Sequence, residues 1–440
     1  MPATDLHTRL QRLRLQKLKR ATPVVPPPPT PLVPPRARPA ARAGEAAQLP
    51  GERVVTRLGD FQLIQTAYDL SFQHGQKRLA DLFAHDAATA ARLARDETLD
   101  AANLQALAFI DTETTGLAGG AGTLVFLVGV GLFDGDQFVL RQYFLLDPGY
   151  EEALLTALVA DLAPRAGWVT FNGRAFDLPL LETRLTLNRQ RGALGQRPHL
   201  DLLTPARRLY RGRLPSCSLG DIERGILRIS REEDDVPGWL IPQMYLDYLR
   251  TGDPGEMRRV IYHNTIDILS MVTLAAHLMD VFATPLGIQP AAKAGRRASV
   301  PTSGPSPEDL LRLACWHADN NRPAEAEAAF KRALAARLGL DDRRLGLTRL
   351  AALLKRQNRR VEAVPVWEQL TSFTVDDPQA FVELAMYYEW HARDLPRALE
   401  WTDRALNVVA GWPAGWRRDL ATGELQRRRD RLQAKRQTVP

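Results

Sequence analysis

A short apolar run that ends in two acids places the strongest limit on the fold of this chain. Residues 106–110 are uniformly apolar, and Asp111 and Glu113 follow before the polar turn 114–116. Such a run is typical of a strand buried on both faces, in which side chains two apart point to the same side. Two carboxylates on one face repel each other unless a cation lies between them. The pair therefore predicts either a site for a divalent metal ion such as Mg²⁺ or Mn²⁺, or a strand that simply ends in a solvated turn.

Two further acids occur in segments that favour the same site. Asp177 precedes Pro179, and proline suits the first turn of a helix, so Asp177 is expected near a helix start. Its alternative role is that of an N-cap. Asp267 interrupts a segment whose apolar residues recur at helical spacing. An acid on such a face is unfavourable to bury unless it is paired or bound to a metal ion.

These acids lie within short motifs that follow one another along the chain. The motifs are Asp-Thr-Glu at 111–113, Thr-Phe-Asn-Gly at 170–173, Phe-Asp-Leu-Pro-Leu at 176–180, Leu-Pro-Ser-Cys-Ser-Leu at 214–219, and His-Asn at 263–264 before Asp267. Together they resemble the four-acid motifs of the ribonuclease-H-like 3'-to-5' exonuclease superfamily, and within it the bacterial YprB-like family of predicted exonucleases. The resemblance covers roughly residues 50 to 285.

The resemblance implies a fold and a mechanism. The fold is an α/β domain with a mixed five-stranded sheet flanked by helices. The mechanism is phosphodiester hydrolysis by two metal ions, Mg²⁺ or Mn²⁺, at the 3' end of DNA or RNA. Asp111 would bridge both ions, and Glu113, Asp177 and Asp267 would complete the ligand shell.

The general base departs from the family pattern. Superfamily members place a histidine five residues before the last acid or a tyrosine four residues before it, whereas here Tyr262 lies five before Asp267 and His263 four before it. His263 is our choice, because imidazole titrates near neutral pH and residues four apart share a helix face. The alternative is that His263 only forms hydrogen bonds with nearby backbone.

Basic and polar residues near the motifs are candidates for contacts with nucleic acid. Four arginines gather within 207–213, which phosphate neutralisation requires, although an arginine-rich helix face is also common as a solvated surface. Asp201 either supports the site or pairs with an arginine. We expect no metal site in the acidic loop 231–238, and the glycine-rich run 119–122 lacks the ending of a phosphate-binding loop. The candidate contacts are Asn172, Arg207, Arg208, Arg211 and Tyr262.

The charge of the chain is concentrated at its start. The first fifty residues hold nine Lys and Arg against two acids, whereas the remaining 49 basic and 49 acidic residues cancel, so the formal net charge of +7 belongs to this leader. Residues 4–20 form an amphipathic helix candidate, and the proline-rich 21–50 cannot build a core. The leader either contacts nucleic acid, an acidic partner or a membrane surface, or only solubilises the chain.

The chain after residue 307 has an internal repeat. Leu-Ala pairs at 313, 350 and 384 are 37 and 34 residues apart, and alanines at 326, 363 and 398 are 37 and 35 apart. This pattern resembles tetratricopeptide repeats, in which small residues let paired helices approach, and a generic helical bundle is the alternative. The expected regions are a disordered leader 1–50, the exonuclease domain 51–285 with its core at 106–285, a linker 286–307, the helical repeats 308–412 and a basic tail 413–440.

Composition narrows the functional class. The sequence shows no segment that approaches a membrane span, and two cysteines suit a reducing cytoplasm. The leading hypothesis is a cytoplasmic, metal-dependent 3'-to-5' exonuclease whose repeats bind a protein partner or guide the strand. The alternative is a catalytically weak or inactive nucleic-acid-binding scaffold. A phosphotransferase that uses Asp111 as nucleophile fits less well, because Glu113 stands where such enzymes usually carry a second aspartate.

Overall fold

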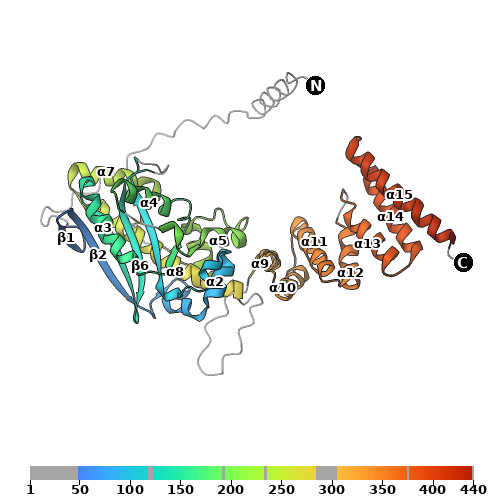
Figure 1. Cartoon of the computed structure of the whole chain (residues 1–440), viewed down its shortest axis with the longest axis horizontal. Coiled ribbons are helices and arrows are strands. Elements are labelled where there is room, and N and C mark those ends of the chain that lie inside the picture. Colours follow the sequence, from blue (N-terminus) through green and yellow to red (C-terminus); the bar gives the residue numbers. More distant parts are fainter. Residues whose placement is uncertain are drawn as a thin grey trace, which may run out of the picture. The chain divides into compact units, whose positions relative to one another are not determined.

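The computed structural model describes residues 48–116, 122–190, 194–231, 235–283, 305–373 and 376–438 (Figure 1). Almost all of the expected leader 1–50 and linker 286–307 lies outside these residues, as does most of the glycine-rich run 119–122. The described residues form a sheet-containing region up to residue 283 and an all-helical region from residue 305.

A seven-stranded mixed sheet forms the centre of the first region. Its strand order is β1-β2-β7-β6-β5-β8-β9, with antiparallel pairing from β1 to β5 and parallel pairing from β5 to β9. The strands are β1 (Glu52–Thr56), β2 (Gly59–Asp69), β5 (Leu107–Thr114), β6 (Val125–Asp134), β7 (Gln137–Leu145), β8 (Gly167–Thr170) and β9 (His199–Asp201). A separate two-stranded sheet pairs β3 (Gln73–His74) with β4 (Lys77–Arg78).

The expected fold class is confirmed, and the sheet has two strands more than the five expected. The additional hairpin is β1–β2, and β2 pairs with β7 from Phe61 to Asp69. Apart from this hairpin the sheet has five strands, the expected number. Pairing of β2 covers what would otherwise be an exposed edge of β7, which is a physical reason for the extension.

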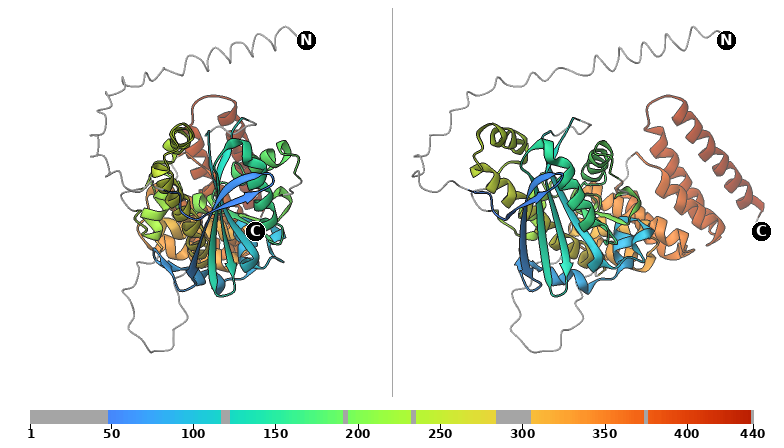
Figure 2. Two further views of the ribbon diagram at one scale, coloured as in Figure 1. Left: turned by 90° about the vertical axis from the view of Figure 1, so that its left-hand side faces the viewer. Right: turned by 60° about the vertical axis from the view of Figure 1, so that its left-hand side comes forward.

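Helices cover both faces of the sheet (Figure 2). They are α2 (Ala87–Ala94), α3 (Glu151–Leu162), α4 (Asp177–Leu187), α5 (Leu203–Tyr210), α6 (Leu219–Ile222), α7 (Ile241–Thr251) and α8 (Gly255–Ala283). Short 3-10 helices are η1 (Leu79–Ala84), η2 (Glu97–Leu99), η3 (Leu104–Ala106), η4 (Pro148–Tyr150), η5 (Leu194–Gln196) and η7 (Gly238–Leu240), and η6 (Glu223–Leu227) is a π-helical turn. One buried cluster contains the C-terminal half of α8, and another contains α3, α4 and the N-terminal part of α8.

Strand β5 has the central position that its sequence predicts. Residues 107–110 are buried between antiparallel β6 and parallel β8. Beyond them the pattern alternates: Asp111 and Glu113 are half-buried, whereas Thr112 and Thr114 are buried. The two acids therefore share one face at the end of a core strand.

Helix α8 is the longest helix of the sheet-containing region. By length and composition it could cross a membrane, so among the described residues the expectation that no segment approaches a span does not hold by this measure. However, 67% of its most apolar window is buried inside the protein. That burial is typical of the core helix of a globular domain, and it explains the apolar composition without a membrane.

The helical region pairs consecutive helices. It comprises α9 (Pro307–Asp319), α10 (Pro323–Ala335), α11 (Leu340–Arg356), α12 (Arg360–Thr371), α13 (Gln379–Trp390), α14 (Leu395–Ala410) and α15 (Trp416–Thr438). The repeated alanines at 314, 351, 385, 326, 363 and 398 are all buried. The basic tail forms α15, where three cations of this helix pair with the buried carboxylate of Glu389.

Candidate active site

Four acids from three elements meet beside the end of β5. Asp111 and Glu113 belong to β5, Asp177 is the first residue of α4, and Asp267 lies near the middle of α8. Asp177 is 5% exposed, and the side chain of Asp267 is 15% exposed. The structure thus brings together the four acids that the motifs single out.

Burial and mutual repulsion disfavour the ionised forms of these acids. Burial raises the pKa of Asp111 well above its ordinary range, and the charges of Asp267 and Asp177 raise it further. Burial, followed by the charge of Asp111, has the same effect on the pKa of Glu113. Burial also raises the pKa of Asp177 to about 6. Because the negative charges of these carboxylates repel one another, a cation among them would favour the ionised form of all four acids.

A fixed loop presents Asp177. Asp201, at the end of β9, accepts hydrogen bonds from the backbone N–H groups of Asn172 (2.9 Å) and Arg174 (3.1 Å), and Asn172 adopts a left-handed backbone conformation. Thr112, on the opposite face of β5 from Asp111, donates its hydroxyl to the Asp177 carboxylate. Asp201 therefore supports the site, the first of the two roles expected for it.

A buried amide chain holds Asp111. Asn264 Nδ2 donates to Asp111 Oδ2 at 2.8 Å, and Gln142 Nε2 donates to Asn264 Oδ1, also at 2.8 Å. Asn264 is completely buried, and a Cβ at Gly129 would lie only 2.2 Å from its Oδ1. Glycine at 129 thus leaves room for this amide. Sequence analysis noted Asn264 only within a motif and missed Gln142, a buried polar residue that follows Arg141 in the mostly apolar strand β7.

His263 and Asp267 share a face of α8, as their spacing predicts. Nε2 of His263 lies 3.6 Å from Asp267 Oδ2, and Nδ1 lies 2.8 Å from Asp235 Oδ1. Arg231 donates to Asp267 from the other side. Both Asp235 and Arg231 belong to the loop in which we expected no metal site, so the described ends of that loop border the acids.

As they stand, these side chains are engaged by protein donors. Among the described residues, no three histidine, cysteine, aspartate or glutamate side chains gather closely enough to hold a metal ion. Three of the acids instead accept hydrogen bonds from protein donors: Asn264 donates to Asp111, Thr112 to Asp177, and Arg231 to Asp267. The donor set nevertheless fits a hard divalent cation, because it offers four carboxylates, and among the described residues Arg231 is the arginine or lysine hydrogen-bonded to one of them.

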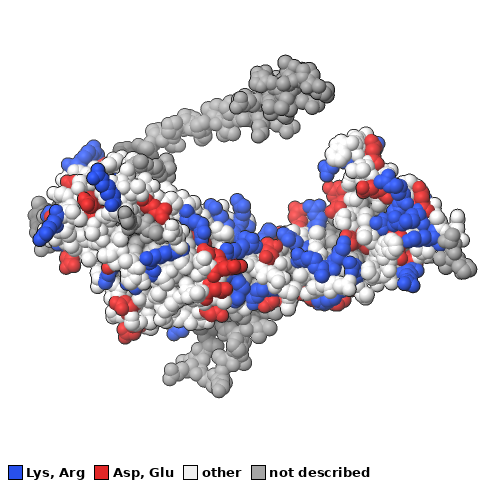
Figure 3. Space-filling view, in the orientation of Figure 1, with Lys and Arg blue, Asp and Glu red and all other residues white. Residues whose placement is uncertain are grey.

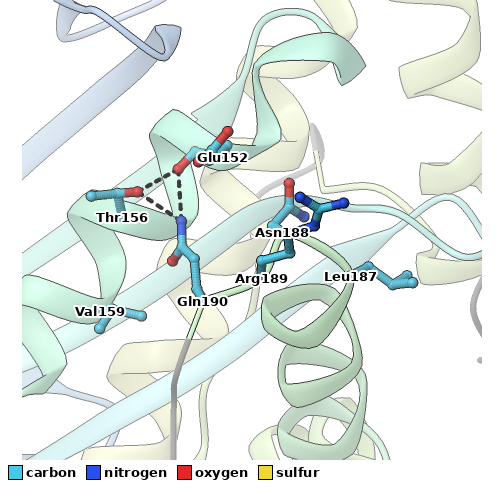
Figure 4. A pocket seen from close by; sticks show the side chains of 7 residues that line it. All are labelled: Glu152, Thr156, Val159, Leu187, Asn188, Arg189 and Gln190. Carbon is cyan, nitrogen blue, oxygen red and sulfur yellow. Dashed lines mark hydrogen bonds between the residues drawn. The ribbon is translucent and has the colours of Figure 1, made fainter.

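Two surface hollows are lined by residues other than the four acids. Figure 4 shows one of about 650 Å³ between α3 and the end of α4, where Gln190 bonds to Thr156 and to the backbone of Glu152. A smaller hollow of about 290 Å³ adjoins the start of α4 and is lined in part by Arg174 and His199. None of the four acids lines either hollow.

The candidate nucleic-acid residues differ in their surroundings. Arg207 and Arg211 are exposed. Arg208 is half-buried, and its guanidinium lies 5.7 Å from the ring centroid of Trp316 in α9, so this arginine contributes to packing. Tyr262 is half-buried beside His263. A contact of these residues with nucleic acid stays a prediction.

Comparison with known proteins shows which sequences this chain resembles. Residues 108–279 match the RNase_H superfamily, a range that contains all four acids. The chain is also 32% identical over 311 residues to the uncharacterized protein YprB of Bacillus subtilis (strain 168), across 70% of this chain and 71% of that protein. The superfamily match ends within α8, so the likeness of the helical region to tetratricopeptide repeats rests on its sequence pattern.

Proposed function

Because the chain belongs to the YprB family and contains a ribonuclease-H-like region, we propose that it is a metal-dependent nuclease that removes nucleotides from the 3' end of DNA or RNA. The observation that carries this proposal is the proximity of four acids from β5, α4 and α8, of which Asp177 is buried and the other three are half-buried. Repulsion among them costs folding free energy unless the site serves a cation.

The four acids would hold two divalent ions, Mg²⁺ or Mn²⁺. Such ions supply charge for the scissile phosphate and lower the pKa of an attacking water. Asp111 suits the shared position, because the charges of both Asp177 and Asp267 act on it. Asn264 holds one Asp111 oxygen in place and leaves the other oxygen available.

We assign the role of general base to His263. Nδ1 of His263 lies 2.8 Å from Asp235 Oδ1, which can only accept a hydrogen bond, and 3.0 Å from Arg231 Nη1, which can only donate one. We take the shorter contact as the hydrogen bond, which assigns the proton to Nδ1. The other ring nitrogen, Nε2, lies 3.6 Å from Asp267 Oδ2, at the edge of the acid site. From there it would take a proton from the attacking water, with Asp235 stabilising the imidazolium that forms.

The helical region would bring a partner or a strand to this site. Stacked helix pairs of the tetratricopeptide type present extended surfaces for binding, and we place the protein in the cytoplasm on its composition. The basic leader adds a further surface for phosphate.

The test compares the purified chain with Asp111→Asn on 3'-labelled and 5'-labelled single and double strands of DNA and RNA. With Mn²⁺ or Mg²⁺ the chain should shorten its substrate from the 3' end, and chelator should stop the reaction. Asp111→Asn should reduce the rate about 100-fold or more, since metal coordination contributes several kcal/mol. Asp134→Asn is the matched control, because Asp134 is exposed in the β6–β7 turn and Asn-Gly is equally suited to such a hairpin.

Two results would count against the nuclease. Equal rates for the chain and Asp111→Asn would show that the acids do not catalyse the cleavage. Intact strands in every lane, together with binding of those strands, would favour the scaffold function instead.

A further inference from the structure

The guanidinium of Arg231 lies inside the acidic site. Its Nε and Nη2 each lie 2.7 Å from a carboxylate oxygen of Glu223, Nη2 also donates to Asp267, and Nη1 is 3.4 Å from Asp235. Nη1 further lies 3.0 Å from Nδ1 of His263. The arginine side chain is only 13% exposed. One cation is therefore already present among the carboxylates.

Glu223 fixes the position of this cation. Its side chain is 1% exposed, and both of its oxygens are engaged by Arg231. A planar fork paired with a carboxylate at two points is held in direction as well as in place. The π-helical turn η6, which begins at Glu223, carries this anchor into the site.

The four acids are consequently unequal. Asp267 is bound on Oδ1 by a full positive charge and faces His263 on Oδ2. Asp111 is held by a neutral amide alone, and the same strand places Glu113 beside it. The charge of Arg231 acts on Asp111 and Glu113 too, but, of the four described acids, its direct contact is with Asp267. A metal ion that approaches Asp267 therefore has to displace a bound cation, whereas one that approaches Asp111 and Glu113 does not.

We propose that Arg231 competes with one of the two metal ions for Asp267, so that the ions bind in two unequal steps. This inference rests on the proposed function, because it concerns the same acids. The first ion binds through Asp111 and Glu113, and the second binds tightly only when Arg231 gives up its contact with Asp267. The bidentate pair with Glu223 survives that exchange, so the guanidinium stays beside the site.

The competing explanation is structural: Arg231 only neutralises Glu223 and keeps the loop folded. The two explanations predict opposite effects on metal affinity. A competitor weakens the second ion, so its removal strengthens binding. A purely structural arginine supports the site, so its removal leaves binding unchanged or weakens it.

The experiment titrates the full chain with Mn²⁺ in the absence of nucleic acid and follows free Mn²⁺ by electron paramagnetic resonance. Two classes of site are expected, and Arg231→Gln should tighten the weaker class about 10-fold or more, because the competing ion pair is lost. Asp267→Asn should remove the weaker class and retain the stronger one. Arg224→Gln is the matched control, because Arg224 is exposed and pairs with Asp221, outside the acid site.

Arg231→Gln leaves the buried Glu223 without its partner, so folding is checked by circular dichroism. The double variant Arg231→Gln, Glu223→Gln removes both charges and should show the same tightening. Unchanged or weaker Mn²⁺ binding in a folded variant would overturn the competition. If the unaltered chain and Asp111→Asn both failed to bind Mn²⁺, the metal site itself, and with it the proposed function, would be excluded.

Discussion

Asp177 shows how a single buried carboxylate opposes folding while it serves a site. It is 5% exposed, and its carboxylate accepts a hydrogen bond from the hydroxyl of Thr112. Burial raises its pKa to about 6, whereas the pKa of an aspartate in an unfolded chain is about 3.9. The folded state thus prefers the protonated carboxyl.

The pH dependence of stability follows from the sign of this shift. Between about pH 4 and 6 the folded chain binds more protons than the unfolded chain, so stability falls as pH rises through that range. In chelator, Asp177→Asn should therefore be more stable than the unaltered chain at pH 8, by up to about 3 kcal/mol, and nearly equal to it at pH 4. The amide oxygen can still accept the Thr112 hydroxyl. Urea unfolding at both pH values measures the difference.

Added Mn²⁺ provides the control for this stability effect. The ion should stabilise the unaltered chain more than the variant at pH 8, because it favours the ionised carboxylate. If Asp177→Asn were equally stable or less stable at pH 8 in chelator, burial of the charge would not be the cause.

At the scale of single residues, the sequence identified the four acids but not the residues that donate hydrogen bonds to them. Asp111, Glu113, Asp177 and Asp267 interrupt apolar or helix-forming segments, and such interruptions are visible in the sequence. The contact from Thr112 to Asp177 spans 65 residues. Arg231, 36 residues before Asp267, sits in a segment whose composition is that of a solvated acidic loop. Only the folded chain places these donors.

At the scale of elements, α8 is joined to the sheet by polar contacts as well as by apolar packing. Asn264 connects α8 to β5 through Asp111 and to β7 through Gln142, and Gly129 of β6 leaves room for its amide. Gln142 also donates to the backbone carbonyl of Ile261 in α8. A shift of the helix would break these contacts together, so they set its register on the sheet.

Substitution of Asn264 tests this junction. Asn264→Ala should lower stability by about 1–3 kcal/mol, because buried partners lose a hydrogen bond. Asn264→Asp should lower stability more at pH 8 than at pH 5, because at pH 8 a second carboxylate ionises beside Asp111. Thermal unfolding at the two pH values measures both effects, and Gln65→Ala on the exposed side of β2 is the control. An Asn264→Asp variant equally stable at both pH values would contradict the account.

Helices and strands with a long, regular pattern of apolar residues could be predicted from the sequence, whereas the two strands at the edges of the sheet, β1 and β9, could not. β5, β6, β7 and α8 carry long buried patterns. β1 is almost entirely exposed, so its sequence lacks the alternation that marks a half-buried strand. β9 has only three residues. Both strands are defined by pairing with a neighbour, a long-range interaction that local pattern does not record.

At the scale of the whole molecule, charge is distributed unevenly along the chain. The +7 of the formal net charge belongs to the leader, and the remaining residues carry equal numbers of basic and acidic groups. Figure 3 shows both signs interspersed on the visible described surface. The residues after the leader have no net charge and contain the acidic site, so they provide little long-range attraction for a nucleic-acid strand. The leader is then the part of the sequence with the charge to supply it.

Deletion of residues 1–47 tests whether the leader binds the substrate. The deletion removes all nine basic residues of the leader and both of its acids, so the net charge falls from +7 to zero. If the leader neutralises phosphates, a labelled single strand should bind the shortened chain more weakly at low salt, and the slope of log affinity against log salt should become shallower by about 0.7 for each lost phosphate contact. Fluorescence anisotropy in chelator measures both without cleavage. A chain whose nine leader Lys and Arg are replaced by Gln keeps the length and should behave like the deletion; an unchanged slope in both would assign the leader to solubility alone.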